Sequence, residues 1–232
     1  MIIQLNQTQV WKAGSAPAVS KELVVLFAEE KSENLLPYDG QAIYFGQVLD
    51  VMEASIYFER LMYSIEWRHD EAVIFGRHIV TKRMAAWYGD SNFSYSYSNT
   101  TKLALPFTPE LAELRRKVEE ISGDRFNSVL LNRYQTGEEG MAWHSDDERS
   151  LGKNSAIASL TLGAERRFAF RHRKTKETLS LVLEHGSLLV MRGETQANWM
   201  HSLPKSKRVV EPRINLTFRR MDDQPDSEKF TK

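Results

Sequence analysis

"SAIASLTLGAERRFAFRHR", residues 155–173, contains two short runs of β-branched and aromatic residues, separated by a glycine and a charged turn. Similar runs recur at regular spacing around it and read "FNSVLLNRY", "MAWHS", "ETLSLVL", "GSLLVMRG" and "RINLTFRR". Short strands at such spacing, with glycine or charged turns between them, are typical of a β-barrel or a double-sheet jelly roll. We therefore predict a β core over residues 126–221.

The part of the chain before this core has a different pattern. Asp50 is placed to cap a helix that we expect to end near Trp67, because apolar residues recur after it at roughly helical spacing. Thr108 begins a second predicted helix, which ends at Gly123. Residues 72–100, between the helices, are rich in aromatic and β-branched residues with turn-like glycines, which predicts β-hairpins.

The composition limits the class of protein and the chemistry of any metal site. The chain has 232 residues, 41% hydrophobic and 27% charged, as in a folded domain rather than a disordered or collagen-like chain. It has no cysteine, so metal ligands must come from histidine, aspartate or glutamate. Lysine and arginine number 31, as do aspartate and glutamate, so a nucleic-acid partner must meet a local basic patch.

No targeting or membrane-spanning segment is recognisable in the sequence. There is no run of about 18 apolar residues, and the N-terminus lacks a basic region followed by a long apolar segment. We expect an intracellular monomer that binds no membrane, cytoplasmic if it is bacterial, with the nucleus as the alternative otherwise.

His144 and Asp146 are the first candidates for chemistry. They are two residues apart, so on a strand or at its edge their side chains leave the same face and can converge on one point. Two histidines and one carboxylate form the open site of non-haem iron(II) oxygenases, and His201, after the strand "GSLLVMRG", is a candidate third ligand. Because H-x-D is common by chance, two polar residues on a loop remain the alternative.

The strand "RINLTFR" has one polar and one apolar face. The polar face would carry Arg213, Asn215, Thr217 and Arg219. An edge strand with this face in water is one interpretation. If the face instead lines the barrel, the guanidinium groups need carboxylates, and a dicarboxylate ligand would supply them. Asn132 and Tyr134, also two apart, are placed to bond the same ligand, with structural hydrogen bonding as their alternative.

Several stretches of the chain resemble the AlkB family of iron(II)- and 2-oxoglutarate-dependent dioxygenases, which repair alkylated nucleic acids. The stretches are "NRYQTGEEGMAWHSDDE", "ASLTLGAERRFAFRH", "HGSLLVMRG", "WMHSLPK" and "PRINLTFR", and they cover most of residues 126–220. "HSDDE" followed at this separation by "PRINLTFR" is a far more specific signal than the H-x-D pair alone. "KRMAAWYGDSNFSYSYS", residues 82–98, resembles the nucleotide-recognition lid of the family.

The resemblance implies a metal site and a co-substrate site. The iron(II) ligands, which would be the catalytic residues, are His144, Asp146 and His201. The residues that would form the 2-oxoglutarate pocket are Asn132, Tyr134, Arg213, Asn215, Thr217 and Arg219. Arg213 would pair with the far carboxylate. The implied reaction consumes O2 and 2-oxoglutarate, which is decarboxylated to succinate and CO2, and hydroxylates an N-methyl group at the iron. The hydroxylated group then leaves as formaldehyde, which restores the base.

The resemblance also implies how a base is bound. 1-Methyladenine and 3-methylcytosine are cationic and pair poorly, so they are cheap to flip out and attractive to an aromatic face. Tyr97, with Tyr95 beside it, would stack on the base, and Glu148 would accept from its exocyclic amine. Arg83 would bind the nucleic-acid strand. Phe75, at a predicted hairpin tip, would wedge into the stack. A solvated loop charge is the alternative for Glu148, and a core ring for Phe75.

Three local basic clusters are candidates for phosphate contacts. They are "RHRK" at 171–174, "KSKR" at 205–208, and Lys82 with Arg83. The leading hypothesis is therefore a demethylase of DNA. An RNA demethylase or a protein-directed dioxygenase of the same family is the second, and a non-catalytic jelly-roll binding module that has lost its metal is the third. The sequence retains all three candidate ligands and both arginines, which argues against a binding module that has lost its metal.

These patterns divide the chain into four parts. Residues 1–45 are predicted as an N-terminal extension, 46–125 as helices and the lid of β-hairpins, 126–221 as the core, and 222–232 as a polar tail. We expect 46–221 to act as one catalytic domain. Its predicted class is mainly β with flanking helices (α+β), with a double-stranded β-helix, or jelly roll, at its centre.

Overall fold

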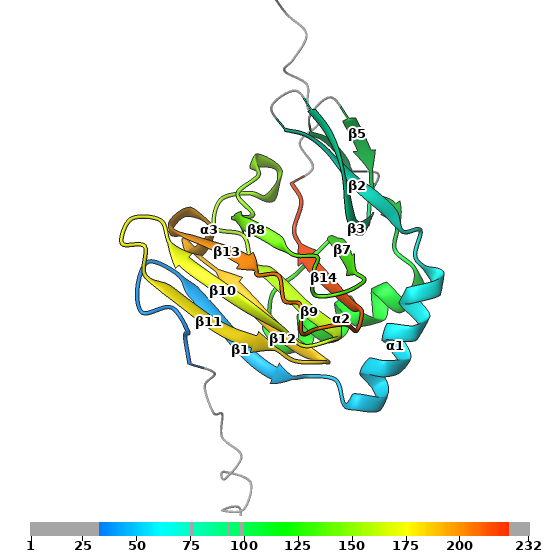
Figure 1. Ribbon diagram of the computed structural model, residues 1–232, viewed down its shortest axis with the longest axis horizontal. Helices are drawn as coiled ribbons and strands as arrows, with labels where there is room; N and C mark the ends of the chain where they lie inside the picture. The colour runs from blue at the N-terminus through cyan, green and yellow to red at the C-terminus, as the bar shows by residue number, and fades with distance from the viewer. Residues whose placement is uncertain (1–32, 75–76, 92, 98–99, 223–232) are drawn as a thin grey trace, which may run out of the picture. The chain divides into compact units, whose positions relative to one another are not determined.

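The computed structural model describes residues 33–74, 77–91, 93–97 and 100–222 (Figure 1). For residues 70–74, 77–79, 94–97, 100–102 and 149 it describes the backbone but not the side chain. The described chain is mainly antiparallel strand with few helices. The predicted class, mainly β with flanking helices, is confirmed.

The larger sheet contains eight strands. Seven of them follow one another in the order β1 (Gln41–Gln47), β12 (Ser187–Arg192), β9 (Ile157–Gly163), β14 (Arg213–Arg219), β7 (Ser128–Tyr134), β3 (Arg77–Gly89) and β2 (Arg68–Ile74). The eighth, β6 (Leu105–Pro106), pairs in parallel with β3. The neighbours along the main path are antiparallel, as expected of a jelly roll.

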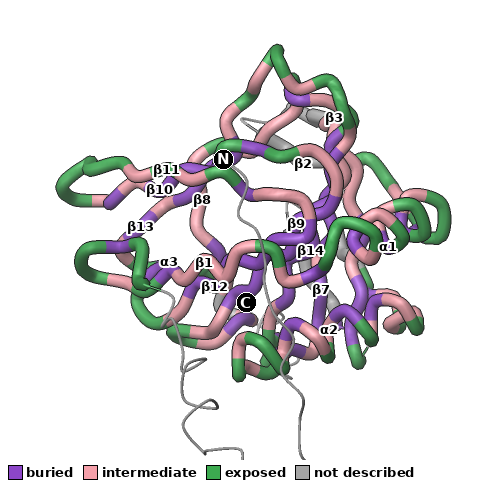
Figure 2. The backbone as a smooth tube through the Cα atoms, turned by 90° about the horizontal axis from the view of Figure 1, so that it is seen from below, coloured by how far each residue is buried: buried purple, intermediate pink, exposed green. Residues whose placement is uncertain are grey.

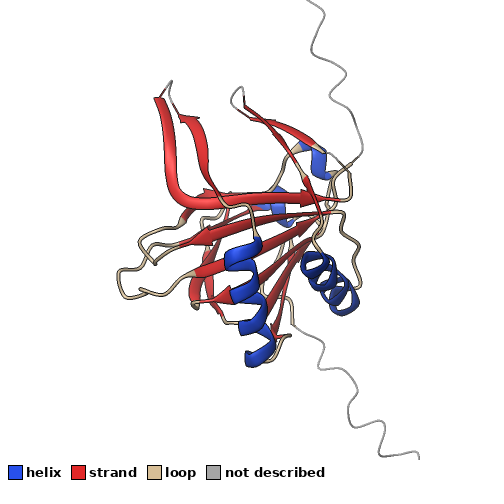
Figure 3. Ribbon diagram, turned by 90° about the vertical axis from the view of Figure 1, so that its right-hand side faces the viewer, coloured by secondary structure: helices blue, strands red, loops and turns tan. Residues whose placement is uncertain are grey.

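A smaller sheet forms the second layer of the core. Its strands follow the order β11 (Thr178–Leu183), β10 (Arg166–His172), β13 (Trp199–Leu203) and β8 (Met141–His144). A short helix, α3 (Thr195–Asn198), leads from β12 into β13. In a third, two-stranded sheet, β4 (Ser94–Tyr97) pairs with β5 (Thr100–Leu103). Figure 3 shows the β2–β3 and β4–β5 hairpins projecting from the same side of the core.

Both predicted helices are present with their predicted caps. In α1 (Val51–Ser64), the Asp50 carboxylate accepts the backbone N–H of Glu53 at 2.8 Å. In α2 (Pro109–Ser122), the Thr108 hydroxyl accepts the N–H of Leu111 at 3.3 Å. Gly123 ends α2 with a positive φ of 78°, which glycine adopts without a steric cost. No helix in the described ranges is long and apolar enough to cross a membrane.

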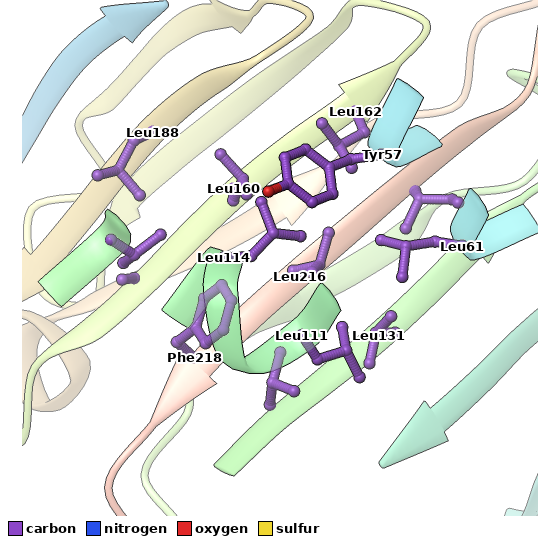
Figure 4. Close-up of a cluster of buried hydrophobic side chains, with 14 of the residues drawn as sticks. Tyr57, Leu61, Leu111, Leu114, Leu131, Leu160, Leu162, Leu188, Leu216 and Phe218 are labelled. Carbon is purple, nitrogen blue, oxygen red and sulfur yellow. The ribbon is translucent and has the colours of Figure 1, made fainter. Parts of the chain in front are cut away.

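The two helices cover one face of the larger sheet. Their buried side chains, which include Leu61 of α1 and Leu114 of α2, form one hydrophobic cluster with Leu160 of β9 and Leu216 of β14 (Figure 4). Figure 2, which is coloured by the burial of each residue, shows buried residues along the central strands and exposed residues at many of the turns. Because alternate residues of a strand point to opposite faces, the polar residues of β14 must point away from the helices.

The opposite face of the larger sheet forms a second cluster with the smaller sheet. Tyr134, Leu189 and Met191 from the larger sheet pack there with Phe168 and Phe170 of β10. The polar residues of β14 therefore point into the space between the two sheets, as the alternation in "RINLTFR" predicts.

Two strands that pair with core strands begin in parts of the chain that the sequence predicts to lie outside the core. β1 begins inside the predicted N-terminal extension and pairs with β12, with Ala42 opposite Met191. β3 starts in the β2–β3 hairpin and ends in the core, where Trp87 lies opposite Leu130 of β7. The hairpin that the sequence predicts as part of a lid and the core thus share one continuous strand.

Candidate active site

A cavity of about 420 Å³ lies between the two sheets. β14 and β7 supply its polar floor, β8 and β13 supply its histidines, and β3 supplies Arg83, Ala85 and Trp87. Its position places the predicted metal ligands, the predicted co-substrate residues and one lid strand in a single space.

His144, Asp146 and His201 come together at this cavity. His144 ends β8 and lies opposite His201 of β13 in the strand register, and their ring centroids are 4.3 Å apart. One potential ligand atom from each of the three residues lies within 4.8 Å of the others. In the part of the chain that the structure describes, this is the one cluster of at least three such ligand groups.

The carboxylate of Asp146 is held in its ionised form. Burial by itself raises its pKa, but Arg219 and then His201 and His144 lower it by more, so the pKa is below the usual value. Arg219 Nη2 lies 2.7 Å from Asp146 Oδ1. The side chain is 6% exposed. Asp146 therefore offers a fixed negative charge to a cation.

The two histidines present ring nitrogens that can bind a metal. Burial, together with His144 and Arg219, lowers the pKa of His201 to about 4 against the raising effect of Asp146, so its ring is neutral at pH 7. The Nδ1 of His144 lies 2.8 Å from the carbonyl oxygen of Ala142, to which it donates when it carries the proton. That tautomer leaves Nε2 free to bind a metal.

Arg213 is a buried cation that pairs with no carboxylate of the described residues. Its Nη2 donates to Thr161 Oγ1 at 2.9 Å and to Asn215 Oδ1 at 2.7 Å, and its guanidinium lies 5.6 Å from the ring centroid of Tyr134. Its side chain is 2% exposed, and burial lowers its pKa to about 10. No carboxylate of the described residues pairs with it, and Nε has no hydrogen-bond partner there. A buried charge in this state needs an anionic ligand.

Asn215 and Thr217 hold this guanidinium in place. Asn215 Oδ1 accepts from both Arg213 and Ser159, and its Nδ2 donates to Thr217 Oγ1 at 2.9 Å. The amide of Asn215 thus forms its hydrogen bonds with neighbouring side chains. Ser159 and Thr161 of β9 were not among the predicted site residues, although their spacing in "ASLTLG" places both on one face.

Asn132 and Tyr134 lie beside this group on β7. In the strand register Asn132 is opposite Asn215, and Tyr134 is opposite Arg213. Both side chains are buried and line the cavity. The structure thus brings all six predicted co-substrate residues to the same cavity.

The predicted substrate residues are only partly described. Glu148 lines the cavity, and its Oε2 is buried without a hydrogen-bond partner among the described residues. Burial raises the pKa of Glu148, with Asp146 adding to the effect and Arg219 opposing it. Arg83 also lines the cavity. The side chains of Tyr95 and Tyr97, on β4, and the whole of Phe75 lie outside the described residues.

One aromatic contact was not predicted. The ring of Phe168, on β10, stacks on His201 with their centroids 5.5 Å apart, and it lines the cavity. Alternation in "RRFAFRHR" places Phe168 on a buried face, but nothing in the sequence pairs it with His201.

Two of the predicted phosphate-binding clusters do not line the cavity themselves. Arg171 lies over the ring of Trp143, and Arg173 lies 3.3 Å from Asp147. Lys205, Lys207 and Arg208 line a second cavity.

Fold and site together define a jelly-roll protein with a two-histidine, one-carboxylate metal site and a buried cation for a carboxylate ligand. Residues 41–219 match the family model of the 2OG-Fe(II) oxygenase superfamily. The chain belongs to that superfamily and, within it, to the AlkB family. The expectation of iron(II), 2-oxoglutarate and O2 as cofactor and co-substrates is confirmed at the level of the family.

Curated relatives support the assignment to the AlkB family. The chain is 44% identical to "DNA oxidative demethylase ALKBH2" of Mus musculus, over 64% of this chain and 65% of that one. It is 38% identical to "Alpha-ketoglutarate-dependent dioxygenase alkB homolog 3" of Homo sapiens, over 79% of this chain and 66% of that one. The matches thus span about two thirds of the relatives' length.

Solved structures support the fold. "The structure of OsALKBH1" superposes with a TM-score of 0.53 at 16% identity, over 77% of this chain and 97% of that one. A 2OG-Fe(II) oxygenase-family oxidoreductase from Burkholderia pseudomallei gives a TM-score of 0.50 at 14% identity, over 78% and 84%. The predicted double-stranded β-helix is confirmed by the strand order and by these neighbours.

Proposed function

We propose that this chain is an iron(II)- and 2-oxoglutarate-dependent dioxygenase that demethylates N-alkylated bases in DNA. The observation that carries the proposal is that a candidate metal triad faces the same cavity as a buried arginine that has no carboxylate partner among the described residues. The names of the most similar relatives, which include a DNA oxidative demethylase, support DNA as the substrate class.

His144, Asp146 and His201 would hold the iron(II). Two imidazoles, of which that of His201 is neutral, and one ionised carboxylate fit a divalent cation and leave coordination positions open. When bound, iron(II) with 2-oxoglutarate and O2 supplies the oxidation of the methyl carbon, with succinate as the co-product. Arg219 would keep Asp146 ionised and fix its Oδ1, so that its other oxygen faces the metal.

Arg213 would bind the far carboxylate of 2-oxoglutarate. Its guanidinium is already oriented by Asn215 and Thr161, so little conformational freedom is lost when the anion binds. Asn132 and Tyr134, opposite the same strand, would donate further hydrogen bonds. Asn215 and Thr217 would act on the ligand through Arg213.

Glu148 would accept from the exocyclic amine of a flipped base. Its raised pKa reflects a buried carboxylate that a cationic base would stabilise in its ionised form. Tyr97 and Tyr95 would stack on the base, Arg83 would hold the strand, and Phe75 would fill the gap in the duplex. These last roles follow from the family resemblance alone.

The test uses three matched oligonucleotides that each contain one 3-methylcytosine: single-stranded DNA, duplex DNA and RNA. We expect loss of the methyl group from at least one DNA substrate, with the unmethylated oligonucleotides as controls. Turnover on RNA or on a peptide, with none on either DNA, would contradict the assignment to DNA and favour the second hypothesis.

Glu148→Gln tests the base-binding role. It removes the negative charge but keeps the shape, so we expect kcat/KM for cationic 3-methylcytosine to fall about tenfold, the value of one charge-assisted hydrogen bond. 3-Methylthymine is neutral and has no exocyclic amine, so its turnover should fall much less. Equal losses on both bases would show that Glu148 supports the fold of the loop rather than the base.

A further inference from the structure

Asp146 lies just beyond the end of the weakest strand of the smaller sheet. β8 has only four residues and one neighbour, β13, and the register between them is irregular. An edge strand of this kind is fixed by few backbone hydrogen bonds. Residues 143–147, which we call the ligand segment, therefore need other contacts to keep Asp146 and His144 at a fixed distance from His201.

Gln196 supplies such a contact from the buried side. Its Oε1 accepts the backbone N–H of Asp146 at 2.9 Å, and its side chain is 8% exposed. A buried backbone N–H beyond a strand end must find a partner of this kind. Gln196 belongs to α3, which leads directly into β13, so its amide links the Asp146 backbone to the strand that carries His201.

α3 is itself well anchored. The Thr195 hydroxyl donates to the carbonyl of Arg192 at 2.6 Å and accepts the backbone N–H of Gln41 at 2.8 Å. Thr195 is 1% exposed. The amide of Gln196 is thus presented to Asp146 from a support that is tied to both β12 and β1.

Two arginines hold the ligand segment from its outer side. Arg173 Nη2 donates to the hydroxyl of Ser145 and lies 3.3 Å from Asp147 Oδ2, so it contacts the residues on both sides of Asp146. The guanidinium of Arg171 lies 4.1 Å from the ring centroid of Trp143, within cation–π distance. Both arginines come from the end of β10 and its following turn, which lies on the far side of β13 from β8.

We propose that Gln196, Arg171 and Arg173 are positioning residues for the metal site, which clamp the ligand segment between α3 and the β10–β11 turn. The proposal rests on the proposed function, since it assumes that His144, Asp146 and His201 bind a metal. If Arg171 and Arg173 only bound phosphates, they would act only when nucleic acid is bound. As positioning residues they act on the metal site in the free protein as well.

The test measures Co(II) binding to the metal-free protein without DNA. Gln196→Met keeps the length of the side chain and removes the acceptor. We expect it to raise the Kd for Co(II) about 10–100-fold, the usual effect of losing a residue that orients a metal ligand, and to change the visible absorption of bound Co(II). Arg173→Met should raise the Kd by up to about tenfold.

Two matched variants separate positioning from general stability. Glu119 Oε1 accepts the backbone N–H of Phe126 at 2.8 Å, away from the cavity, and Arg116 forms an exposed pair with Glu120. Glu119→Met and Arg116→Met should leave the Kd and the absorption spectrum native, whatever they do to the melting temperature.

A native Kd and spectrum in both Gln196→Met and Arg173→Met would overturn the proposal. If Gln196→Met does not fold, the Kd and spectrum of Arg173→Met alone test the proposal, and native values in that variant overturn it. The metal site has its own control: absence of Co(II) binding by the native chain, or unchanged binding by His144→Ala, overturns the proposed function and with it the positioning role.

Discussion

Asp146→Ala is expected to abolish demethylation, with kcat/KM lower by about 1,000-fold or more. Asp146 is the one carboxylate of the triad, and its pKa is held low by Arg219 and the two histidines. Its loss removes the negative charge that offsets the cation, an effect on the order of 4 kcal/mol in the transition state. The measurement is formaldehyde release from a methylated oligonucleotide at saturating iron(II) and 2-oxoglutarate.

Asp90→Ala is the matched control for this variant. Asp90 also pairs with an arginine, Arg115, at 2.7 Å, but it is half exposed and does not line the cavity. Native turnover is expected, because an exposed pair contributes little to stability. A folded Asp146→Ala protein that still turns over would show that this carboxylate does not bind the metal.

Arg213→Met should change co-substrate binding and stability in opposite directions. We expect the KM for 2-oxoglutarate to rise about 100-fold, because a charge-assisted contact with a buried guanidinium contributes on the order of 3 kcal/mol. Without 2-oxoglutarate, the variant should be as stable as the native protein or more stable, since Arg213 has no carboxylate among the described residues. Replacing buried charges with apolar groups of similar volume often stabilises a protein.

Arg166→Met provides the contrast. Arg166 is also 2% exposed, but its Nη2 donates to the backbone carbonyls of Gly137, Glu139 and Pro204. Its replacement removes the donor of the Glu139 and Pro204 carbonyls, whereas the Gly137 carbonyl still accepts the backbone N–H of Ser206. We therefore expect a loss of about 3 kcal/mol in the free energy of unfolding. The KM for 2-oxoglutarate should change little. A native KM in Arg213→Met would contradict the assignment of Arg213 to the co-substrate.

Local patterns in the sequence predicted much of the fold. The alternation in "RINLTFR" predicted which residues of β14 share a face, and the caps at Asp50 and Thr108 predicted where both helices begin. Which face of β14 lines the cavity was left open by the sequence. The position of His201 opposite His144 depends on the pairing of β13 with β8. Strand pairing at this separation cannot be predicted from periodicity. The place of His201 after a predicted strand therefore made it only a candidate, and the family resemblance assigned it as the third ligand.

Other features could not be predicted because they depend on long-range contacts. The apolar run in "QAIYFGQ" is compatible with a strand, but only its pairing with β12 shows that it belongs to the core. The sequence predicts Asn215 as a ligand-binding amide, whereas its side chain forms hydrogen bonds with Arg213, Ser159 and Thr217. Gln196 contacts a residue fifty positions away, and no local signal marks it.

The most direct test of the proposed function is the ratio of products in one reaction. The native chain is incubated with iron(II), 2-oxoglutarate, O2 and a DNA oligonucleotide that contains 3-methylcytosine, and three quantities are followed: succinate, formaldehyde and unmodified cytosine. We expect all three to form in equal amounts, and none to form in Asp146→Ala. Succinate release without formaldehyde or restored cytosine would contradict the assignment of this cavity to oxidative demethylation of DNA.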